Sequence, residues 1–362
     1  MADRVDGDGG GPLATRETLE TAFRLQRAGS EIFGSDLYEA LCKQALADLQ
    51  REGPIHRLLH DWEGDPVRGF LPLRLLGAVH ERVLAGAAPE LARFYPSMGG
   101  TPSWPEIWTA FLAVVEGEPD ALRERLAHFP QTNEVRRCAG LLGGFLSAAQ
   151  ATGLPLRIRE LGCSGGLNLH WDRYRYELGP HRWGNPHSPV RLVADWSGGA
   201  PPLATRARVE SRAGCDIAPR RVEDPEQARL LEAYVWPDQV DRIAPLRAAV
   251  GMARESPPRI DPRPAGEWLA DELAHEAEGT CTVVYHSAFW IYLPDAEQQS
   301  VRGLIEARGE RATASTPLAW LRHEDGEVPG TIEVRLRLWP GGEERHLAMS
   351  HPHGRRVEWL AD

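Results

Sequence analysis

The sequence predicts an α/β protein in which an all-helical N-terminal domain precedes a mostly parallel sheet with an antiparallel C-terminal hairpin. Three observations support this fold class. Apolar residues recur at helical spacing from about residue 15 to 150. After Pro155 the pattern changes to short alternating or β-branched runs, separated by helical stretches. The last runs, Thr331 to Leu338 and Glu344 to Met349, flank Pro340-Gly341-Gly342 and predict the hairpin.

The helical domain, residues 15–150, contains four amphipathic stripes. The first runs from Leu37 to Leu49 and stops at Gly53-Pro54. The others run from Leu71 to Val83, from Ile107 to Val115 and from Val135 to Ala149. Residues 1–14 are rich in Gly and Asp and predict a loose tail. No strand is expected before residue 155.

The second domain, residues 151–362, begins with a strand at 156–161 that ends in the turn Gly162-Cys163-Ser164-Gly165-Gly166. Residues 172–206 are polar, aromatic and turn-rich, and predict an insertion. Further strands are expected at 207–215, 258–261, 281–285 and 310–315, and helices at 225–235, 239–254, around 268–273 and at 295–308. Strands that alternate with helices predict a mostly parallel sheet.

The composition is that of a folded, acidic protein. The chain has 362 residues, 42% of them hydrophobic, and a formal net charge of −11. The hydrophobic share is enough for a buried core at this length. The negative charge argues against general nucleic-acid binding.

Export, membrane insertion, disulfides and metal binding are not indicated. The first residues lack the apolar stretch of a signal peptide. The charge-free run from Cys138 to Leu156 contains polar residues and Pro155, and predicts a buried helix with a turn rather than a membrane span. The five cysteines form no CxxC pair, and His351-x-His353 lacks a third ligand. We therefore expect a cytoplasmic protein without a metal.

The glycine turn exposes backbone N–H groups at the start of the next segment, a geometry that three kinds of site use. It fits G-x-S-x-G, the nucleophile elbow of serine hydrolases, with Ser164 as the nucleophile. Asp261 with His286, or Asp325 with His351, would complete the triad. The helical character of the preceding 150 residues argues against that fold. A dinucleotide-binding turn is weakly supported, because Ser164 replaces the middle glycine of G-x-G-x-x-G.

The turn also matches acid-x-G-x-x-x-G, the first motif of class I S-adenosylmethionine-dependent methyltransferases. The chain resembles that superfamily at further points, since Arg212 to Pro219 resembles its second strand, Pro258 to Asp261 its third and Val283 to Ser287 its fourth. The resemblance implies a Rossmann-like methyltransferase core with a seven-stranded sheet. Two features depart from it: Ser164 stands where glycine is common, and about fifty residues separate the turn from Asp216.

Three phrases resemble an uncharacterised bacterial family more narrowly. They are Phe129-Pro130-Gln131-Thr132-Asn133-Glu134-Val135, Tyr234-Val235-Trp236-Pro237-Asp238-Gln239, and His286-Ser287 with Tyr292-Leu293. The family is a domain of unknown function with a methyltransferase-like core. The similarity covers nearly the whole chain beyond the tail, but it implies no established reaction.

The methyltransferase resemblance implies a cofactor site for S-adenosylmethionine. Its residues are Glu160, Gly162, Ser164, Gly166, Asp216 and Asp261. Glu160 would lie near the ammonium end of the cofactor, Asp216 would accept hydrogen bonds from the ribose, and Asp261 would lie near the adenine. Plainer interpretations remain open: a tight turn for the glycines, a helix cap for Asp216 and an Asp-Pro turn for Asp261.

The same resemblance implies an acceptor site near the end of the fourth strand. Its residues are Asn133, Arg136, Ser287, Trp290 and Tyr292, with His286 as the candidate base. Arg136 would bind a carboxylate. Here too structural roles remain open, as a helix cap for Asn133, a backbone-bonded histidine for His286 and aromatic packing for Trp290 and Tyr292.

Together these features predict methyl transfer from S-adenosylmethionine to a small molecule, with the helical domain and residues 172–206 shaping the acceptor site. No membrane or nucleic-acid partner is expected, and the oligomeric state is open. The alternatives are a non-catalytic module that binds the cofactor or a nucleotide, and a serine hydrolase that uses Ser164.

Overall fold

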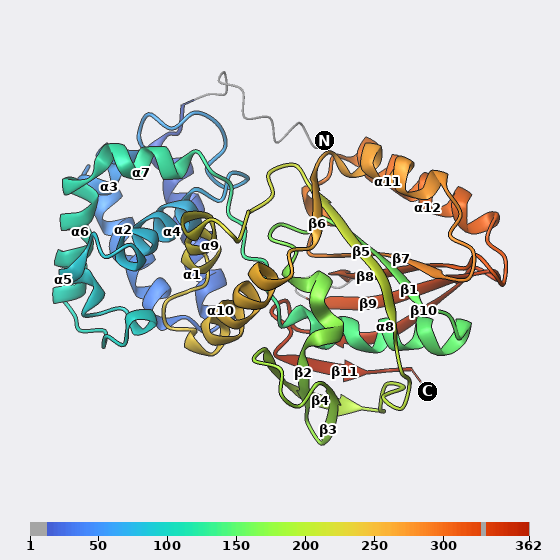
Figure 1. The fold of residues 1–362 in the computed structure, drawn as a ribbon. Coiled ribbons are helices and arrows are strands. Elements are labelled where there is room, and N and C mark those ends of the chain that lie inside the picture. Colours follow the sequence, from blue (N-terminus) through green and yellow to red (C-terminus); the bar gives the residue numbers. More distant parts are fainter. Residues whose placement is uncertain (1–12, 327–330, 362) are drawn as a thin grey trace. The chain divides into compact units, whose positions relative to one another are not determined.

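The computed structural model describes residues 13–326 and 331–361, and this part of the chain divides into two compact units (Figure 1). One unit comprises residues 133–223 and 245–361 and contains the sheet. The other comprises residues 13–132 and 224–244 and is helical. Of the predicted tail, residues 1–14, all but the last two lie outside the described residues.

The helical unit is built from amphipathic helices whose apolar stripes share one core. Helices α2 (Asp36–Gln50), α4 (Leu71–Leu84) and α6 (Glu106–Gly117) contain the first three predicted stripes, which are buried together. Ser35 caps α2 by accepting the N–H of Tyr38. The other helical elements are α1 (Arg16–Ile32), α3 (Pro54–Leu59), α5 (Pro89–Ala92), η1 (Pro96–Met98), α7 (Pro119–Leu126) and α9 (Pro225–Ala233). Helix α10 (Val240–Glu255) begins in this unit and ends in the other.

The second unit contains one eleven-stranded sheet in the described part of the chain, in the order β3-β2-β4-β11-β10-β9-β8-β7-β1-β5-β6. Its strands are β1 (Leu156–Leu161), β2 (Arg175–Leu178), β3 (His181–Gly184), β4 (Arg191–Gly198), β5 (Val209–Asp216), β6 (Arg259–Pro262), β7 (Cys281–Ser287), β8 (Leu318–Asp325), β9 (Ile332–Trp339), β10 (Glu343–Ser350) and β11 (Arg356–Trp359). Six of the ten neighbouring pairs are parallel. The predicted α/β class, the mostly parallel sheet and the antiparallel hairpin β9–β10 are therefore confirmed.

Two expectations about this sheet need correction. The sheet has eleven strands in the described part of the chain rather than seven, and β2, β3 and β4 of the expected insertion at 172–206 join it through the parallel pair β4–β11. The strand expected at 310–315 lies instead at 318–325. Residues 313–316 form a turn in which the Thr313 and Thr316 side chains bond each other and the backbone, which Ser and Thr favour outside strands.

The two faces of the sheet are covered by different helices. On one face lies α8 (Arg137–Thr152), whose Phe145 ring contacts Tyr285 of β7 at a centroid distance of 5.0 Å. On the other face lie α11 (Ala265–Ala274) and α12 (Asp295–Glu310), which neighbour each other in Figure 1 and share a core with Val284 and Trp320. The sequence division after residue 150 assigns α8 to the helical domain, whereas in the structure α8 packs on the sheet.

The strand order reverses at one point of the parallel part. After β1 the chain first forms β2, β3 and β4 at the far end of the sheet. It then adds β5 and β6 on one side of β1, and later β7 and β8 on the opposite side. The carboxyl ends of β1 and β7 therefore flank a topological switch point. In open α/β sheets, ligands bind in the crevice at such a point.

Candidate functional site

The glycine turn follows β1 directly at the switch point. Gly162, Ser164 and Gly166 all have left-handed backbone conformations, with φ of 68°, 50° and 67°. The carboxylate of Asp216, at the end of β5, accepts the backbone N–H of Ser164 at 2.9 Å and that of Ala218 at 2.9 Å. Asp216 therefore ties the turn to the end of the adjacent strand.

Both glycines of the motif lie close to other parts of this chain. A side chain at Gly162 would stand 2.1 Å from the ring of Phe289, and one at Gly166 would stand 2.7 Å from Ile260. Each residue thus needs glycine for its backbone angle and for the protein atoms packed on it. The phenyl ring of Phe289 forms one wall of the glycine turn.

Glu160 is a fully buried acid near the end of β1, on the sheet face that α8 covers. Its Oε2 accepts the hydroxyl of Tyr285 at 2.7 Å. Burial raises the pKa of Glu160 to about 8, while the Tyr285 bond and the charge of Arg137 lower it and the charge of Asp216 raises it. A buried acid with a raised pKa at a switch point is a feature of functional sites.

His286 points to the opposite face, where both of its ring nitrogens are bonded. Nδ1 lies 2.5 Å from Oε1 of Glu324, and Nε2 lies 3.1 Å from the indole nitrogen of Trp320. The ring also stacks on Trp290 at 4.8 Å and is fully buried. In this arrangement neither nitrogen faces a substrate.

The segment from the end of β7, Ser287 to Leu293, includes the short helix η3 (Trp290–Tyr292) and lies against the glycine turn through Phe289. Ser287 is nearly buried and Trp290 partly buried, whereas Tyr292 is 41% exposed beside Ile291, which is 54% exposed. An aliphatic and an aromatic side chain therefore face solvent next to the turn.

The start of α8 and the residues just before it contact the site. The side-chain oxygen of Asn133 accepts the N–H of Leu167, the residue that follows the glycine turn. Arg136 is buried, and its backbone N–H bonds the side chain of Glu134. The side chain of Arg137 reaches the end of β7, where it donates to the carbonyl of Ser287 at 3.2 Å, and it also donates to the carbonyl of Pro352 at 3.0 Å.

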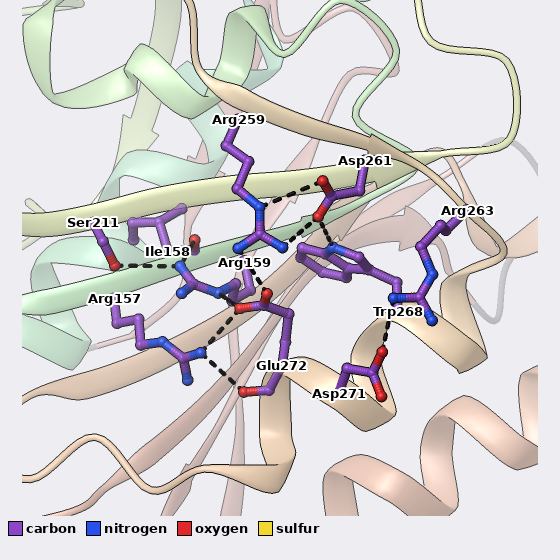
Figure 2. Close-up of polar contacts among 10 residues, drawn as sticks. All are labelled: Arg157, Ile158, Arg159, Ser211, Arg259, Asp261, Arg263, Trp268, Asp271 and Glu272. Atoms are coloured by element: carbon purple, nitrogen blue, oxygen red, sulfur yellow. Dashed lines mark hydrogen bonds and ion pairs between the residues drawn. The ribbon is translucent and has the colours of Figure 1, made fainter.

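Asp261 belongs to an ion network on the α11 face (Figure 2). Its carboxylate accepts Arg259 at 2.5 Å and the indole N–H of Trp268 at 2.7 Å. Arg259 continues to Glu272 of α11, which also pairs with Arg157 and Arg159 of β1. The described contacts of Asp261 are thus with its own strand and helix, and its predicted place near an adenine stays a prediction.

Four residues of this region were not predicted from the sequence. Tyr285 lies in an apolar run that indicates only a strand, and Phe289 comes shortly after it. Glu324 lies outside the strand that the sequence predicted at 310–315, and Arg137 stands next to the predicted Arg136. From the sequence, Arg137 was only the neighbour of Arg136 in a helix expected from Asn133, whereas α8 begins at Arg137 and Asn133 lies before it. The contacts of Tyr285 and Glu324 depend on strand register, and that of Phe289 depends on the path of the chain after β7, which the sequence does not state.

The hydrolase triad Ser164–His286–Asp261 is not assembled in this structure. Glu324 and Trp320 bond the two nitrogens of His286, and Arg259 and Trp268 bond the carboxylate of Asp261. Among residues 13–326 and 331–361 there is no group of three side chains that could hold a metal ion. In the same ranges, no helix combines the length and the apolar character needed to span a membrane.

Comparison with known proteins identifies one family. A family model described as "Uncharacterized protein conserved in bacteria (DUF2332)" matches residues 20–359, nearly the whole chain. No curated protein and no solved structure matches the chain.

Proposed function

We propose that this chain, which belongs to the DUF2332 family of uncharacterised bacterial proteins, transfers a methyl group from S-adenosylmethionine to a small-molecule acceptor. The family description gives no reaction, so the proposal depends on the site. The observation that carries it is the glycine turn at the switch point between β1 and β7, tied by Asp216 to the end of β5. This is the place where doubly wound sheets bind nucleotide-like ligands.

The residues around the turn fit such a cofactor. The carboxylate of Asp216 lies at the end of β5 beside the turn, and in this proposal it would accept hydrogen bonds from the ribose hydroxyls. Glu160 would face the ammonium end, and an adjacent cation would compensate the cost of its buried charge. Phe289 offers an aromatic wall, which suits a sulfonium. Bound there, S-adenosylmethionine would supply an activated methyl group.

The chain would act mainly by binding and orienting two reactants. Such positioning contributes roughly 7–11 kcal/mol to lowering a barrier, and a base adds about 10²–10⁴-fold only where the acceptor must lose a proton. His286 is still the candidate base predicted from the sequence, but it reaches a substrate only after its bond to Trp320 opens. Ser287, Trp290 and Tyr292 would line the acceptor side, with Arg136 and Asn133 behind them.

Calorimetric titration with S-adenosylmethionine and S-adenosylhomocysteine tests the proposal. We expect binding that weakens about tenfold or more in Asp216→Asn and stays unchanged in Asp271→Asn, whose exposed carboxylate pairs with Arg263. No heat and no thermal stabilisation at millimolar ligand would refute the cofactor assignment. Tight binding without any methylated product would favour the non-catalytic module, and ester hydrolysis lost in Ser164→Ala would favour the hydrolase.

A further inference from the structure

Glu324, near the carboxyl end of β8, bonds three groups of the neighbouring strand end. Its Oε1 lies 2.5 Å from Nδ1 of His286 and 3.0 Å from the backbone nitrogen of Phe289. Its Oε2 lies 3.1 Å from the same nitrogen of Phe289 and 3.3 Å from that of Trp290. The Glu324 side chain is only 12% exposed, so these bonds form largely away from water.

The hydrogen bond from Trp320 determines which atoms of this network donate and which accept. An indole N–H only donates, so Nε2 of His286 accepts and its ring proton is on Nδ1, where it is donated to Glu324. All three partners of Glu324 are therefore N–H donors. A carboxylate, which only accepts, satisfies every one of them.

The same segment is held from its other side. Ala288 has a left-handed φ of 46° and donates its N–H to the carbonyl of His323 at 2.9 Å. Arg137 donates to the carbonyl of Ser287. With the segment held at these points, the Phe289 ring lies on Gly162. The segment therefore contacts the glycine turn through Phe289.

We propose that Glu324 is a positioning residue of the site: its bonds hold the Ser287–Leu293 segment in the shape that keeps Phe289 on Gly162, and thereby set the affinity of the glycine turn for its ligand. The claim about ligand affinity rests on the proposed function, whereas the claim about the shape of the segment does not. Glu324 touches neither reactant. It acts through Phe289 and Trp290.

Glu324→Gln tests this with little change of shape. The substitution replaces one carboxylate oxygen, an acceptor, with an NH₂ group, a donor. That NH₂ group then faces an N–H of His286, Phe289 or Trp290, so the hydrogen bond at that position is lost. Glu177→Gln is the matched control, because Glu177 of β2 is similarly buried and bonded to Arg191, but lies at the far end of the sheet. Phe289→Leu removes the aromatic wall while leaving the backbone bonds to Glu324 in place.

Two measurements are made on the full chain, namely hydrogen exchange of the amides of Phe289 and Trp290, and the Kd for S-adenosylhomocysteine. In Glu324→Gln we expect exchange at least tenfold faster and a Kd about tenfold higher, with neither changed in Glu177→Gln. Phe289→Leu should raise the Kd with little change in exchange. If Glu324→Gln does not fold, Phe289→Leu still tests the link between the segment and the turn, and an unchanged Kd there overturns it.

Unchanged exchange in a folded Glu324→Gln would overturn the proposal. Faster exchange with an unchanged Kd would also overturn it, because Glu324 would then only stabilise the segment. Failure of the wild-type chain to bind S-adenosylhomocysteine would refute the proposed function instead. The exchange measurement would then still decide whether Glu324 holds the segment.

Discussion

Glu160 illustrates how the site depends on single side chains. An isolated carboxylate inside a protein is costly, so burial favours its protonated form. The phenol of Tyr285 and the charge of Arg137 offset only part of this cost, and the pKa of Glu160 remains at about 8. Near neutral pH the apo protein therefore holds a protonated carboxyl at the end of β1.

Glu160→Gln should make the protein more stable than wild type at pH 8, but not at pH 4.5. Because the pKa of Glu160 is about 8 in the folded state and near 4.5 in the unfolded state, its contribution to stability is full below pH 4.5 and is lost as the pH rises to about 8. A glutamine does not titrate, so the difference should grow to a few kcal/mol. Urea unfolding at pH 4.5, 6.5 and 8 measures it. Parallel curves for the two proteins would contradict the raised pKa, and Glu90→Gln on the exposed surface is the control.

At the scale of elements, α8 approaches the sheet through glycines. A side chain at Gly143 would stand 2.2 Å from the indole of Trp359, and one at Gly144 would stand 2.3 Å from Leu321. Both neighbours are buried, so neither moves freely. The close approach brings Phe145 onto Tyr285 and thus encloses Glu160.

Gly143→Ala should therefore destabilise the protein by roughly 1–3 kcal/mol, the usual cost of overpacking. The matched change Gly303→Ala in α12 should stabilise it by about 0.5–1 kcal/mol, since nothing lies within 4 Å of that position and alanine favours a helix. Thermal and urea unfolding compare the two. Stabilisation by both changes would show that α8 does not need the glycine at this contact.

Helix α11 is held to the sheet by charge as well as by apolar contacts. Glu272 pairs with Arg157 at 2.9 Å, Arg159 at 2.5 Å and Arg259 at 2.9 Å (Figure 2). Burial opposes its ionisation, but the nearby guanidinium groups outweigh that effect and lower the pKa of Glu272. Burial and the neighbouring Arg157 in turn lower the pKa of Arg159 to about 10.

Glu272→Gln should cost roughly 3–5 kcal/mol, because it leaves buried guanidinium groups without their counter-charge. Its neighbour Asp271 provides the control, since the exposed Asp271–Arg263 pair should contribute no more than about 1 kcal/mol. Denaturant unfolding of Glu272→Gln and Asp271→Asn tests the difference. Similar losses in both would mean that the network adds nothing beyond a surface ion pair.

Local patterns in the sequence predicted the elements of the site better than its contacts. The alternation at 156–161 followed by glycines, the apolar run at 281–285 and the acid at the end of 207–215 each depend on neighbouring residues, and they matched β1, β7 and β5. Whether Glu160 and His286 share a face depends on strand pairing, and the register puts them on opposite faces. Glu324 could not be predicted, because it bonds His286 across 38 residues of chain.

At the scale of the whole molecule, the chain passes between the two units three times, after residues 132, 223 and 244. The sequence indicated a single domain boundary, after residue 150, because helical periodicity continues through α8. No local pattern marks residues 224–244 as part of the helical unit. Their membership comes from contacts with residues far earlier in the chain. Asp238 accepts the hydroxyl of Ser35 and the N–H of Leu37, and Trp236 lies in the helical core.

Glu81 of α4 makes another of these contacts. It is fully buried and accepts Arg229 of α9 at 2.7 Å, with Arg125 at 3.7 Å and Arg82 at 3.9 Å. Arg82 and Arg125 also pair with Glu118 and Glu226, whereas Arg229 has Glu81 as its described carboxylate partner. The bond between Glu81 and Arg229 therefore joins chain segments that are 148 residues apart.

Glu81→Gln should loosen residues 224–244 from the helical unit, because Glu81 is fully buried and a neutral amide there cannot compensate the charge of Arg229, whose side chain is 30% exposed. We expect faster hydrogen exchange in peptides from α9, by tenfold or more, and a lower melting temperature of the whole chain. Glu90→Gln, which removes an exposed partner of Arg93, should change neither. If exchange in α9 stayed at the wild-type rate, the apolar contacts around Trp236 and Leu231 would hold this segment without the charge. The attachment of residues 224–244 to the helical unit would then depend on apolar packing alone.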